Sequence, residues 1–223
     1  MNVLLAAATL AEIHITKQYL ENTNFRINQH QVDILITGIG GIAATYNLVK
    51  GIEHKKPGYI IQAGIAGGFN IEMPLGTTVC VCEEIIGDLG AEEQHEFRDL
   101  FDLGLMKEND PPFTGRILKN PFISKQRDPA LPLVRSVSIN EITTKKDRIE
   151  FLRRKFKAEI ESMEGAAFHY VCLCEKIPFI QIRSISNYVG ERNKEKWNIV
   201  LAVDNLNSTI IQVLQQLSTD QPT

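Results

Sequence analysis

The stretch Ile182-Arg183-Ser184-Ile185-Ser186-Asn187 carries the strongest information about the fold of this chain. Its β-branched residues predict a buried strand that ends in a polar side chain. In open α/β sheets, ligands bind at the carboxyl ends of the strands. The stretch therefore predicts an α/β protein with Asn187 at its functional site.

Short apolar segments of the same kind recur along the chain and alternate with helical patterns. Strands are predicted at residues 2–8, 32–37, 59–63, 77–82 and 179–185. Helices are predicted near 11–21, 41–53, 164–176 and 196–217, the last with an apolar stripe that includes Trp197, Val200 and Leu201. This alternation predicts an α/β domain with a largely parallel sheet.

The length of the chain suits one sizeable domain, and we expect a single domain over residues 1–223. Prolines punctuate the polar stretch 83–132, which predicts an irregular excursion from the sheet, in part a lid or an oligomer contact. Residues 218–223 are expected to form a frayed tail.

Charge and hydropathy exclude two classes of partner. The net charge of -3 gives no basic footprint, which argues against nucleic acid. The apolar opening of the chain has no positively charged segment and reaches Glu12 too early for a membrane-spanning helix. We therefore expect a buried first strand, no membrane association and a cytoplasmic location.

The four cysteines come in two pairs, Cys80-x-Cys82 and Cys172-x-Cys174. Zinc sites of cysteine ligands use a wider spacing within each pair. We expect these residues to act as small buried hydrophobic side chains, and we expect no metal site.

Two glycine-rich turns follow predicted strands, Gly38-Ile39-Gly40-Gly41 and Gly64-Ile65-Ala66-Gly67-Gly68. Such turns let a ligand approach the backbone, although tight packing of a helix on the sheet explains them equally well. Neither completes a dinucleotide or Walker fingerprint, so no organic cofactor is expected. A third motif, Glu161-Ser162-Met163-Glu164-Gly165, leads into a helix, where an acid is often only a cap or dipole partner.

In combination, these motifs resemble the purine nucleoside phosphorylase/nucleosidase superfamily, with a layout closest to the methylthioadenosine/S-adenosylhomocysteine nucleosidases. The runs Gly87-Asp88-Leu89-Gly90-Ala91-Glu92 and Ser186-Asn187-Tyr188-Val189 are similar to those of the futalosine hydrolase family. The resemblance implies a three-layer αβα sandwich with a central mixed, largely parallel sheet, and a homo-oligomer. The implied activity is cleavage of futalosine into hypoxanthine and dehypoxanthinyl futalosine, in menaquinone biosynthesis.

The resemblance also implies roles for individual residues. Glu12 would activate water, since a carboxylate can accept the proton as water attacks C1′, although an exposed acid at a helix start is the alternative. Glu164 would hold the ribose hydroxyls. Further substrate contacts are expected from Gly64, Ile65, Met163, Ile142 and Arg192, where Met163 would pack on the ribose or fill the core, and Arg192 would bind the benzoate of futalosine or lie solvated.

Asn187 departs from the pattern of the adenine-releasing nucleosidases, which have an aspartic acid at this position. An asparagine has no proton to give, but its amide offers two donors. Hypoxanthine presents acceptors at N7 and O6, so Asn187 favours a 6-oxopurine as the leaving group. Arg183, in the same strand, is either an ion-pair partner within the sheet or a substrate contact.

Two positions favour water over phosphate as the nucleophile. Many phosphorylases of the superfamily have an arginine where Gln62 stands and a hydroxyl residue where Ile65 stands, and a phosphate dianion needs such cationic partners. The alternatives are a nucleosidase or phosphorylase acting on aminofutalosine, methylthioadenosine or inosine, and a noncatalytic nucleoside sensor. The pair Glu12 and Glu164 argues against the sensor, because binding alone has little need of a water-activating acid.

Overall fold

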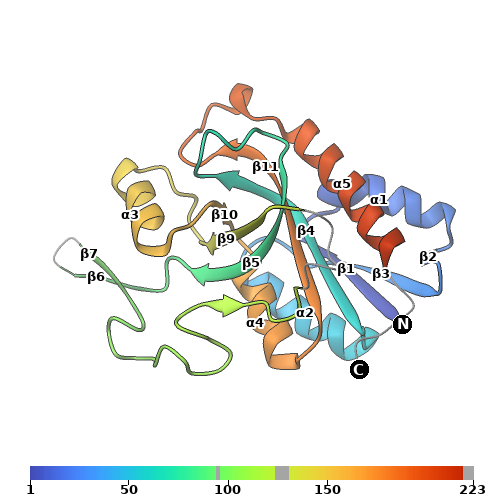
Figure 1. The fold of residues 1–223 in the computed structure, drawn as a ribbon, viewed down its shortest axis with the longest axis horizontal. Coiled ribbons are helices and arrows are strands. Elements are labelled where there is room, and N and C mark those ends of the chain that lie inside the picture. The colour runs from blue at the N-terminus through green and yellow to red at the C-terminus, as the bar shows by residue number, and fades with distance from the viewer. Residues whose placement is uncertain (94–95, 124–130, 218–223) are drawn as a thin grey trace.

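The computed structural model describes residues 1–93, 96–123 and 131–217, and within them a nine-stranded sheet lies between two layers of helices. The helices α1 (Leu10–Asn22) and α5 (Ile199–Gln216) cover one face, and α2 (Gly41–Lys55) and α4 (Gly165–Glu175) cover the other (Figure 1). This arrangement confirms the predicted three-layer αβα sandwich.

The sheet is mixed, as predicted. Eight of its strands follow the order β10 (Ile160–Ser162), β9 (Leu133–Ser138), β5 (Thr78–Ile86), β11 (Phe179–Tyr188), β4 (Tyr59–Gly68), β1 (Asn2–Ala7), β3 (His30–Ile36) and β2 (Arg26–Ile27), and the ninth, β8 (Leu118–Lys119), pairs with β5. The strands β11, β4, β1 and β3 run parallel to one another, whereas β5 is antiparallel to β11. The short strand β10 pairs with both β9 and β4, so this end of the sheet closes on itself.

The five predicted strands appear as β1, β3, β4, β5 and β11, several of them longer than expected. The sequence interpretation missed β9, β10 and the helix α3 (Lys146–Phe156). Charged residues dominate α3, and its buried residues are Leu152 and Phe156. Ile149, Leu152 and Phe156 recur at helical spacing, so the sequence held an amphipathic signal that the interpretation did not use.

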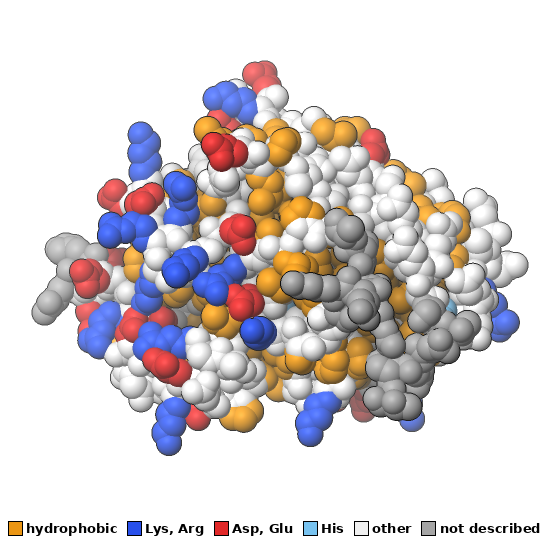
Figure 2. All heavy atoms as spheres, viewed as in Figure 1, with side chains coloured by type: hydrophobic (Ala, Val, Ile, Leu, Met, Phe, Trp, Pro, Cys, Tyr) orange, Lys and Arg blue, Asp and Glu red, His pale blue; other side chains and the backbone are white. Residues whose placement is uncertain are grey.

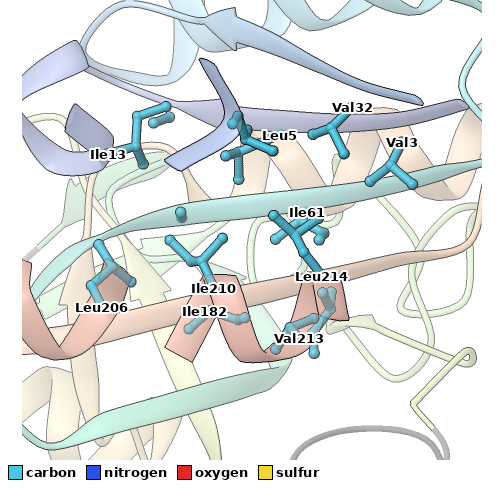
Figure 3. Packing of buried hydrophobic residues seen from close by; sticks show 14 of the residues in the cluster. Val3, Leu5, Ile13, Val32, Ile61, Ile182, Leu206, Ile210, Val213 and Leu214 are labelled. Carbon is cyan, nitrogen blue, oxygen red and sulfur yellow. The ribbon is translucent and has the colours of Figure 1, made fainter. Parts of the chain in front are cut away.

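The core between the sheet and the layer of α1 and α5 joins the strands that carry the site. Leu5, Ile61 and Ile182 come from three neighbouring strands and pack against Leu206 and Ile210 of α5 (Figure 3). Burial of one such side chain contributes about 1.5–3 kcal/mol. The packing therefore holds α5 against β1, β4 and β11.

The apolar stripe predicted for the last helix is wrong at its start. Val200 is 73% exposed and Leu201 39% exposed, and Trp197 precedes the helix. The helix begins at Ile199, and its buried face starts only at Ala202.

The predicted excursion at residues 83–132 leaves the sheet and returns to it. It begins inside β5, forms the hairpin of β6 (Gly90–Glu93) and β7 (Glu96–Asp99), and rejoins β5 through β8 (Leu118–Lys119). Residues 94–95 and 124–130, and the predicted tail at 218–223, lie outside the described residues. The single domain and the lid or oligomer role of the excursion stay predictions.

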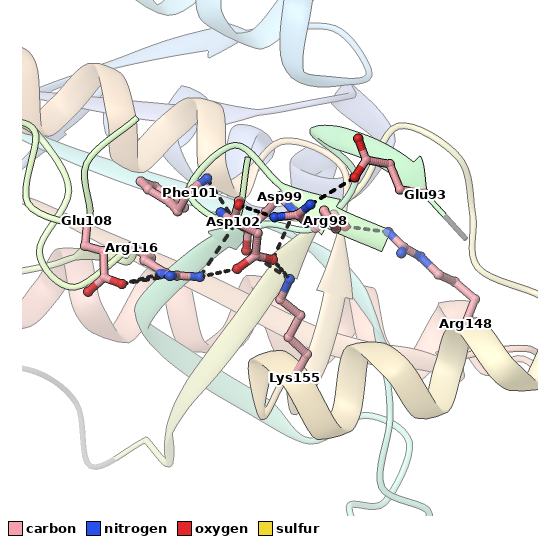
Figure 4. Close-up of polar contacts among 10 residues, drawn as sticks. Glu93, Arg98, Asp99, Phe101, Asp102, Glu108, Arg116, Arg148 and Lys155 are labelled. Atoms are coloured by element: carbon pink, nitrogen blue, oxygen red, sulfur yellow. Dashed lines mark hydrogen bonds and ion pairs between the residues drawn. The ribbon is translucent and has the colours of Figure 1, made fainter. Parts of the chain in front are cut away.

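Ion pairs fasten the excursion to α3. Arg116 Nη1 lies 2.7 Å from Asp102 Oδ1, and Lys155 Nζ of α3 lies 3.2 Å from Asp99 Oδ2 and also pairs with Asp102 (Figure 4). Figure 2 shows the charged side chains gathered on this side of the molecule. The opposite charges compensate one another, so these ion pairs have a structural role: they hold the excursion against α3.

Candidate active site

The sequence motifs meet at the carboxyl ends of the parallel strands. Glu12 follows β1, the turn at Gly38–Gly41 follows β3, and Ile65 lies near the end of β4. Asn187 stands at the end of β11, two strands away from β1. This edge of an α/β sheet is the usual place of a ligand site.

Glu12 is held on both oxygens and is not a solvated acid at a helix start. The backbone N–H and the hydroxyl of Thr9 donate to Glu12 Oε2 at 2.9 and 3.1 Å. The backbone N–H of Ile65 donates to Glu12 Oε1 at 3.2 Å. The carboxylate thus spans from the first turn of α1 to β4, with part of the side chain exposed.

A side chain from α5 is inserted into α1 directly behind Glu12. Asn207 Oδ1 accepts from the backbone N–H of Thr16 at 2.8 Å, and Asn207 Nδ2 donates to the carbonyl of Glu12 at 2.9 Å. In a regular helix Thr16 N–H would donate to Glu12 C=O. The insertion kinks α1 at Ile13, whose φ of -125° and ψ of 18° are not helical.

Glu164 is buried at the start of α4 and joins two other elements. The backbone N–H of Gly40 donates to its Oε1 at 3.0 Å. Arg183 Nη1 lies 3.6 Å from its Oε2 and donates to the carbonyl of Ile65 at 3.4 Å. Arg183 is therefore an ion-pair partner within the structure, and one N–H of the glycine turn binds the protein's own carboxylate.

Gly64 leaves the space in which these side chains meet. A Cβ atom on Gly64 would overlap Arg183 Nη1 and would lie 3.0 Å from Glu12 Oε1. The absence of a side chain at this position thus leaves room for Glu12 and Arg183 beside β4.

The amide of Asn187 has a fixed orientation. The hydroxyl of Ser186 donates to Asn187 Oδ1 at 2.8 Å, and Asn187 Nδ2 donates to the carbonyl of Tyr188 at 3.1 Å. Nδ2 lies 3.5 Å from the position of a Cβ on Gly67. Since an amide carries two N–H donors, one remains besides the N–H that bonds to Tyr188.

The other predicted contacts lie around this group. Met163 is half-buried and lines a cavity of about 190 Å³ together with Gly41, Asn140 and Tyr170. Ile142 is 46% exposed in the loop after β9.

Arg192 lies on an exposed loop, where its guanidinium packs over the ring of Trp197 at 5.4 Å. Among the described residues it forms no hydrogen bond or ion pair with another predicted site residue. Asp88, whose role the sequence left open, accepts from Asn140 Nδ2 at 3.2 Å and so ties two loops together.

A buried acid that the sequence interpretation missed lies under α4. Glu84 Oε1 accepts from the hydroxyl of Ser138 at 2.9 Å, and that hydroxyl accepts from the backbone N–H of Ala166 at 2.7 Å. Burial raises the pKa of Glu84 to about 7. A Cβ on Gly165 would overlap Glu84 Oε2, so the first turn of α4 rests directly on this acid. The available signal was a charged residue within the apolar run of β5.

The described residues form neither a metal centre nor a membrane-spanning helix. No group of three or more His, Cys, Asp or Glu side chains in the described ranges is placed to hold a metal ion. No helix in this part of the chain is long and apolar enough to cross a membrane.

Nucleoside-cleaving enzymes are among the known proteins that this chain resembles. The futalosine hydrolase of Streptomyces coelicolor is 25% identical over 208 residues, which cover 85% of this chain and 81% of the relative. A 5′-methylthioadenosine/S-adenosylhomocysteine nucleosidase of Bacillus thuringiensis is 24% identical over 239 residues, covering 97% of this chain and 100% of the relative. The structure of futalosine hydrolase from Helicobacter pylori has the same fold, with a TM-score of 0.78 at 16% identity and coverage of 97% and 98% of the two chains.

The family model of the phosphorylase superfamily matches residues 4–217, which include each of the site residues described above. The resemblance of the motifs and the αβα architecture are both confirmed by this match. The chain belongs to the phosphorylase superfamily.

Proposed function

We propose that this protein hydrolyses the N-glycosidic bond of a purine nucleoside, and that its substrate is futalosine. The observation that carries the proposal is the amide of Asn187, whose Oδ1 accepts from Ser186 and whose Nδ2 keeps one N–H besides the one that it donates to Tyr188. A donor at this position suits the acceptors N7 and O6 of hypoxanthine. The products are then hypoxanthine and dehypoxanthinyl futalosine.

Glu12 is the proposed general base. Cleavage of a glycosidic bond passes through an oxocarbenium-like transition state, in which a carboxylate takes a proton from the attacking water. The water oxygen forms a bond to C1′ and gives its proton to Glu12, the bond from C1′ to the purine nitrogen breaks with its electron pair going to the base, and the departing base takes a proton from solvent water. The two hydrogen bonds from Thr9 and the one from Ile65 hold the carboxylate in place for this step.

Glu164 is the proposed partner of the ribose hydroxyls. A charged hydrogen bond to the 2′-hydroxyl strengthens as positive charge develops on the sugar. Arg183 and the backbone N–H of Gly40 fix the carboxylate, and Arg183 balances its charge inside the protein. Gly64, Ile65, Met163 and Ile142 complete the proposed contacts to the substrate.

Water is the proposed nucleophile because the site offers little to a phosphate dianion. Gln62 is neutral and buried, and Ile65 is apolar. The guanidinium Nη1 of Arg183 is already engaged by Glu164 and by the carbonyl of Ile65. Phosphate sites rely on cationic forks that are open to the ligand.

Arg192 is the proposed partner of the benzoate carboxylate of futalosine. It lies in the loop that follows β11, and its guanidinium is exposed beside Trp197. We also propose a homo-oligomer that acts in the cytoplasm in menaquinone biosynthesis, with one domain per chain and no metal or organic cofactor.

A second candidate is cleavage of methylthioadenosine or S-adenosylhomocysteine. The match to the Bacillus thuringiensis nucleosidase favours it, because that match covers the full length of the relative. The two candidates differ in the released base, which is adenine in the second case.

The test follows base release by chromatography from futalosine, aminofutalosine, inosine and methylthioadenosine, each with and without phosphate. We expect fast hypoxanthine release from futalosine that phosphate does not change. Preferential release of adenine supports the second candidate and contradicts the choice of futalosine. A requirement for phosphate contradicts hydrolysis, and binding of futalosine without cleavage identifies a sensor.

A further inference from the structure

Glu84 of β5 and Glu164 of α4 are two buried carboxyl groups that meet at the first turn of α4. Glu84 is fully buried, and Glu164 is 5% exposed. Gly165 directly follows Glu164 in the chain, and a Cβ atom on Gly165 would overlap Glu84 Oε2. The backbone that carries Glu164 therefore rests on the carboxyl group of Glu84.

Ser138 of β9 fastens the same turn to Glu84 by two hydrogen bonds. Its hydroxyl accepts from the backbone N–H of Ala166 at 2.7 Å and donates to Glu84 Oε1 at 2.9 Å. Ala166 is the second residue of α4, so its N–H is one of the four that have no acceptor within the helix. Two consecutive residues after Glu164 are thus connected to Glu84, one by direct contact and one through Ser138.

Arg183 of β11 is the cation that lies near both acids. Its Nη1 lies 3.6 Å from Glu164 Oε2, and Glu164 is its ion-pair partner among the described residues. Burial raises the pKa of Glu84 to about 7, and the hydrogen bond from Ser138 and the charge of Arg183 oppose this effect. The Nε and Nη2 atoms of Arg183 are buried and form no hydrogen bond among the described residues. The guanidinium therefore has donors left for a second carboxylate.

We propose that Glu84 is a positioning residue for Glu164, and that it acts through the first turn of α4 and through the guanidinium of Arg183. This inference rests on the proposed function, in which Glu164 holds the ribose hydroxyls. Glu84 lies beneath Gly165 and is fully buried, so it acts on the substrate only through Glu164.

The charge of Glu84 decides how firmly Arg183 holds Glu164. A neutral Glu84 leaves the guanidinium with Glu164, whereas an ionised Glu84 attracts it through the Nε and Nη2 donors. Two buried carboxylates then share one cation, and a buried charge without full compensation is unfavourable. Ionisation of Glu84 therefore loosens the Glu164 carboxylate and weakens its hydrogen bond to the 2′-hydroxyl.

The neighbours of Glu84 leave this acid as the group that titrates near neutral pH. The polar side chains around it from other elements are Ser136 and Ser138 of β9, Gln181 and Arg183 of β11, and Glu164 of α4. His169 of α4 is fully buried, and burial lowers its pKa to about 4, so it stays neutral above pH 6. A guanidinium stays charged throughout this range.

The test measures the contribution of the ribose 2′-hydroxyl to binding at pH 6 and at pH 8. Calorimetry gives the affinities of inosine and 2′-deoxyinosine for Glu12→Gln, which should bind nucleosides without cleaving them. We expect this variant to prefer inosine by about 10-fold at pH 6, the effect of one charged hydrogen bond, and to lose most of this preference at pH 8. The two nucleosides share one base, so any titration of the base cancels in the ratio.

Three further variants, each combined with Glu12→Gln, assign the pH dependence to Glu84. Glu84→Gln has no charge at either pH and still offers an acceptor to Ser138, so it should keep the preference for inosine at both pH values. Glu84→Ala lacks the acceptor and should lose the preference at both. Glu83→Gln is the matched control, since Glu83 precedes Glu84 on β5 and pairs with Arg135 instead. It should respond to pH as Glu12→Gln alone does.

Two results overturn the proposal. One is a preference for inosine that is equal at pH 6 and pH 8 in Glu12→Gln alone, a result that does not depend on the folding of any Glu84 variant. The other is a pH dependence that persists in a folded protein with Glu84→Gln. The predicted pH dependence in a protein that does not cleave futalosine contradicts the proposed function and leaves this inference standing, whereas a protein that binds neither nucleoside contradicts both.

Discussion

Asn207 replaces the helical hydrogen bond behind Glu12: its Nδ2 donates to the Glu12 carbonyl at 2.9 Å, across 195 residues of sequence. The same amide accepts the N–H group of Thr16 that would otherwise bond to this carbonyl. The direction in which the Glu12 carboxylate leaves α1 is therefore set by α5. A residue buried in the core thus positions the proposed general base.

Asn207→Leu should lower kcat by about 10- to 100-fold and change KM little, because α1 straightens and the Glu12 carboxylate turns away from Ile65. Steady-state kinetics with futalosine as the substrate measure kcat and KM separately. Asn205→Leu is the matched control, since Asn205 on the same helix bonds to Gly76 and makes no contact of this kind with α1. Equal losses of kcat in the two variants would show that Asn207 acts only through stability.

Glu12→Gln should lower kcat by about 10²- to 10⁴-fold, the usual contribution of a positioned general base. The amide can still accept the N–H of Ile65, so substrate binding should persist, which equilibrium binding of futalosine measures. Glu21→Gln at the other end of α1 controls for the change in charge. A Glu12→Gln enzyme with more than a tenth of the wild-type kcat would remove Glu12 from the mechanism.

Gly64→Ala should inactivate the enzyme, because the methyl group would overlap Arg183 Nη1 and crowd the carboxylate of Glu12. Overpacking of this kind lowers stability by about 1–3 kcal/mol. Urea unfolding and kinetics measure the two effects. Gly58→Ala serves as the control, since a Cβ there meets Met1 at an ordinary 3.5 Å. Normal activity in Gly64→Ala would mean that Arg183 and Glu12 need not approach β4 so closely.

Glu84 should make stability depend on pH in a definite direction. Burial raises its pKa from 4.5 to about 7, so the folded state holds this proton more tightly than the unfolded state does. The free energy of unfolding therefore falls as the pH rises from about 4.5 to about 7, by up to about 3 kcal/mol from this group.

In Glu84→Gln this decline is absent. The free energy of unfolding of the variant, relative to wild type, should be higher at pH 8 than at pH 5. Urea unfolding at the two pH values measures the difference. The same relative stability at both would mean that Glu84 does not hold a proton in the folded state.

Arg192→Ala should reduce kcat/KM for futalosine by about 10-fold and leave inosine, which has no carboxylate, unaffected. Arg153→Ala on the exposed face of α3 controls for the lost charge. A variant that retains the full preference for futalosine over inosine would place the benzoate elsewhere.

The sequence predicted those strands and helices whose formation depends mainly on the residues within them. The β-branched run that ends at Asn187 forms β11, as predicted, and Glu12 lies close to β4 at Gly64. The polar strand β10 has only three residues, so its strand propensity is weak, and its pairing with β4 depends on how the whole sheet closes. The pairing of β10 with β4 therefore had no local signal in the sequence.

Asn207 is a second residue whose role depends on contacts between distant parts of the chain. A polar residue beside Leu206 and Ile210 marks a break in the apolar face of α5, and this much is visible in the sequence. Its partners, Glu12 and Thr16, lie in the first helix of the chain. Only the packing of α5 on α1 shows that Asn207 positions the proposed general base, Glu12.

The most direct test of the account is a competition between equal amounts of futalosine and methylthioadenosine in one reaction without phosphate. Mass spectrometry follows the loss of each nucleoside, and the ratio of the two rates gives the ratio of kcat/KM. We predict that futalosine disappears first, with one hypoxanthine released for each molecule consumed. Faster loss of methylthioadenosine, with release of adenine, would contradict the assignment of the substrate and of the base that Asn187 selects.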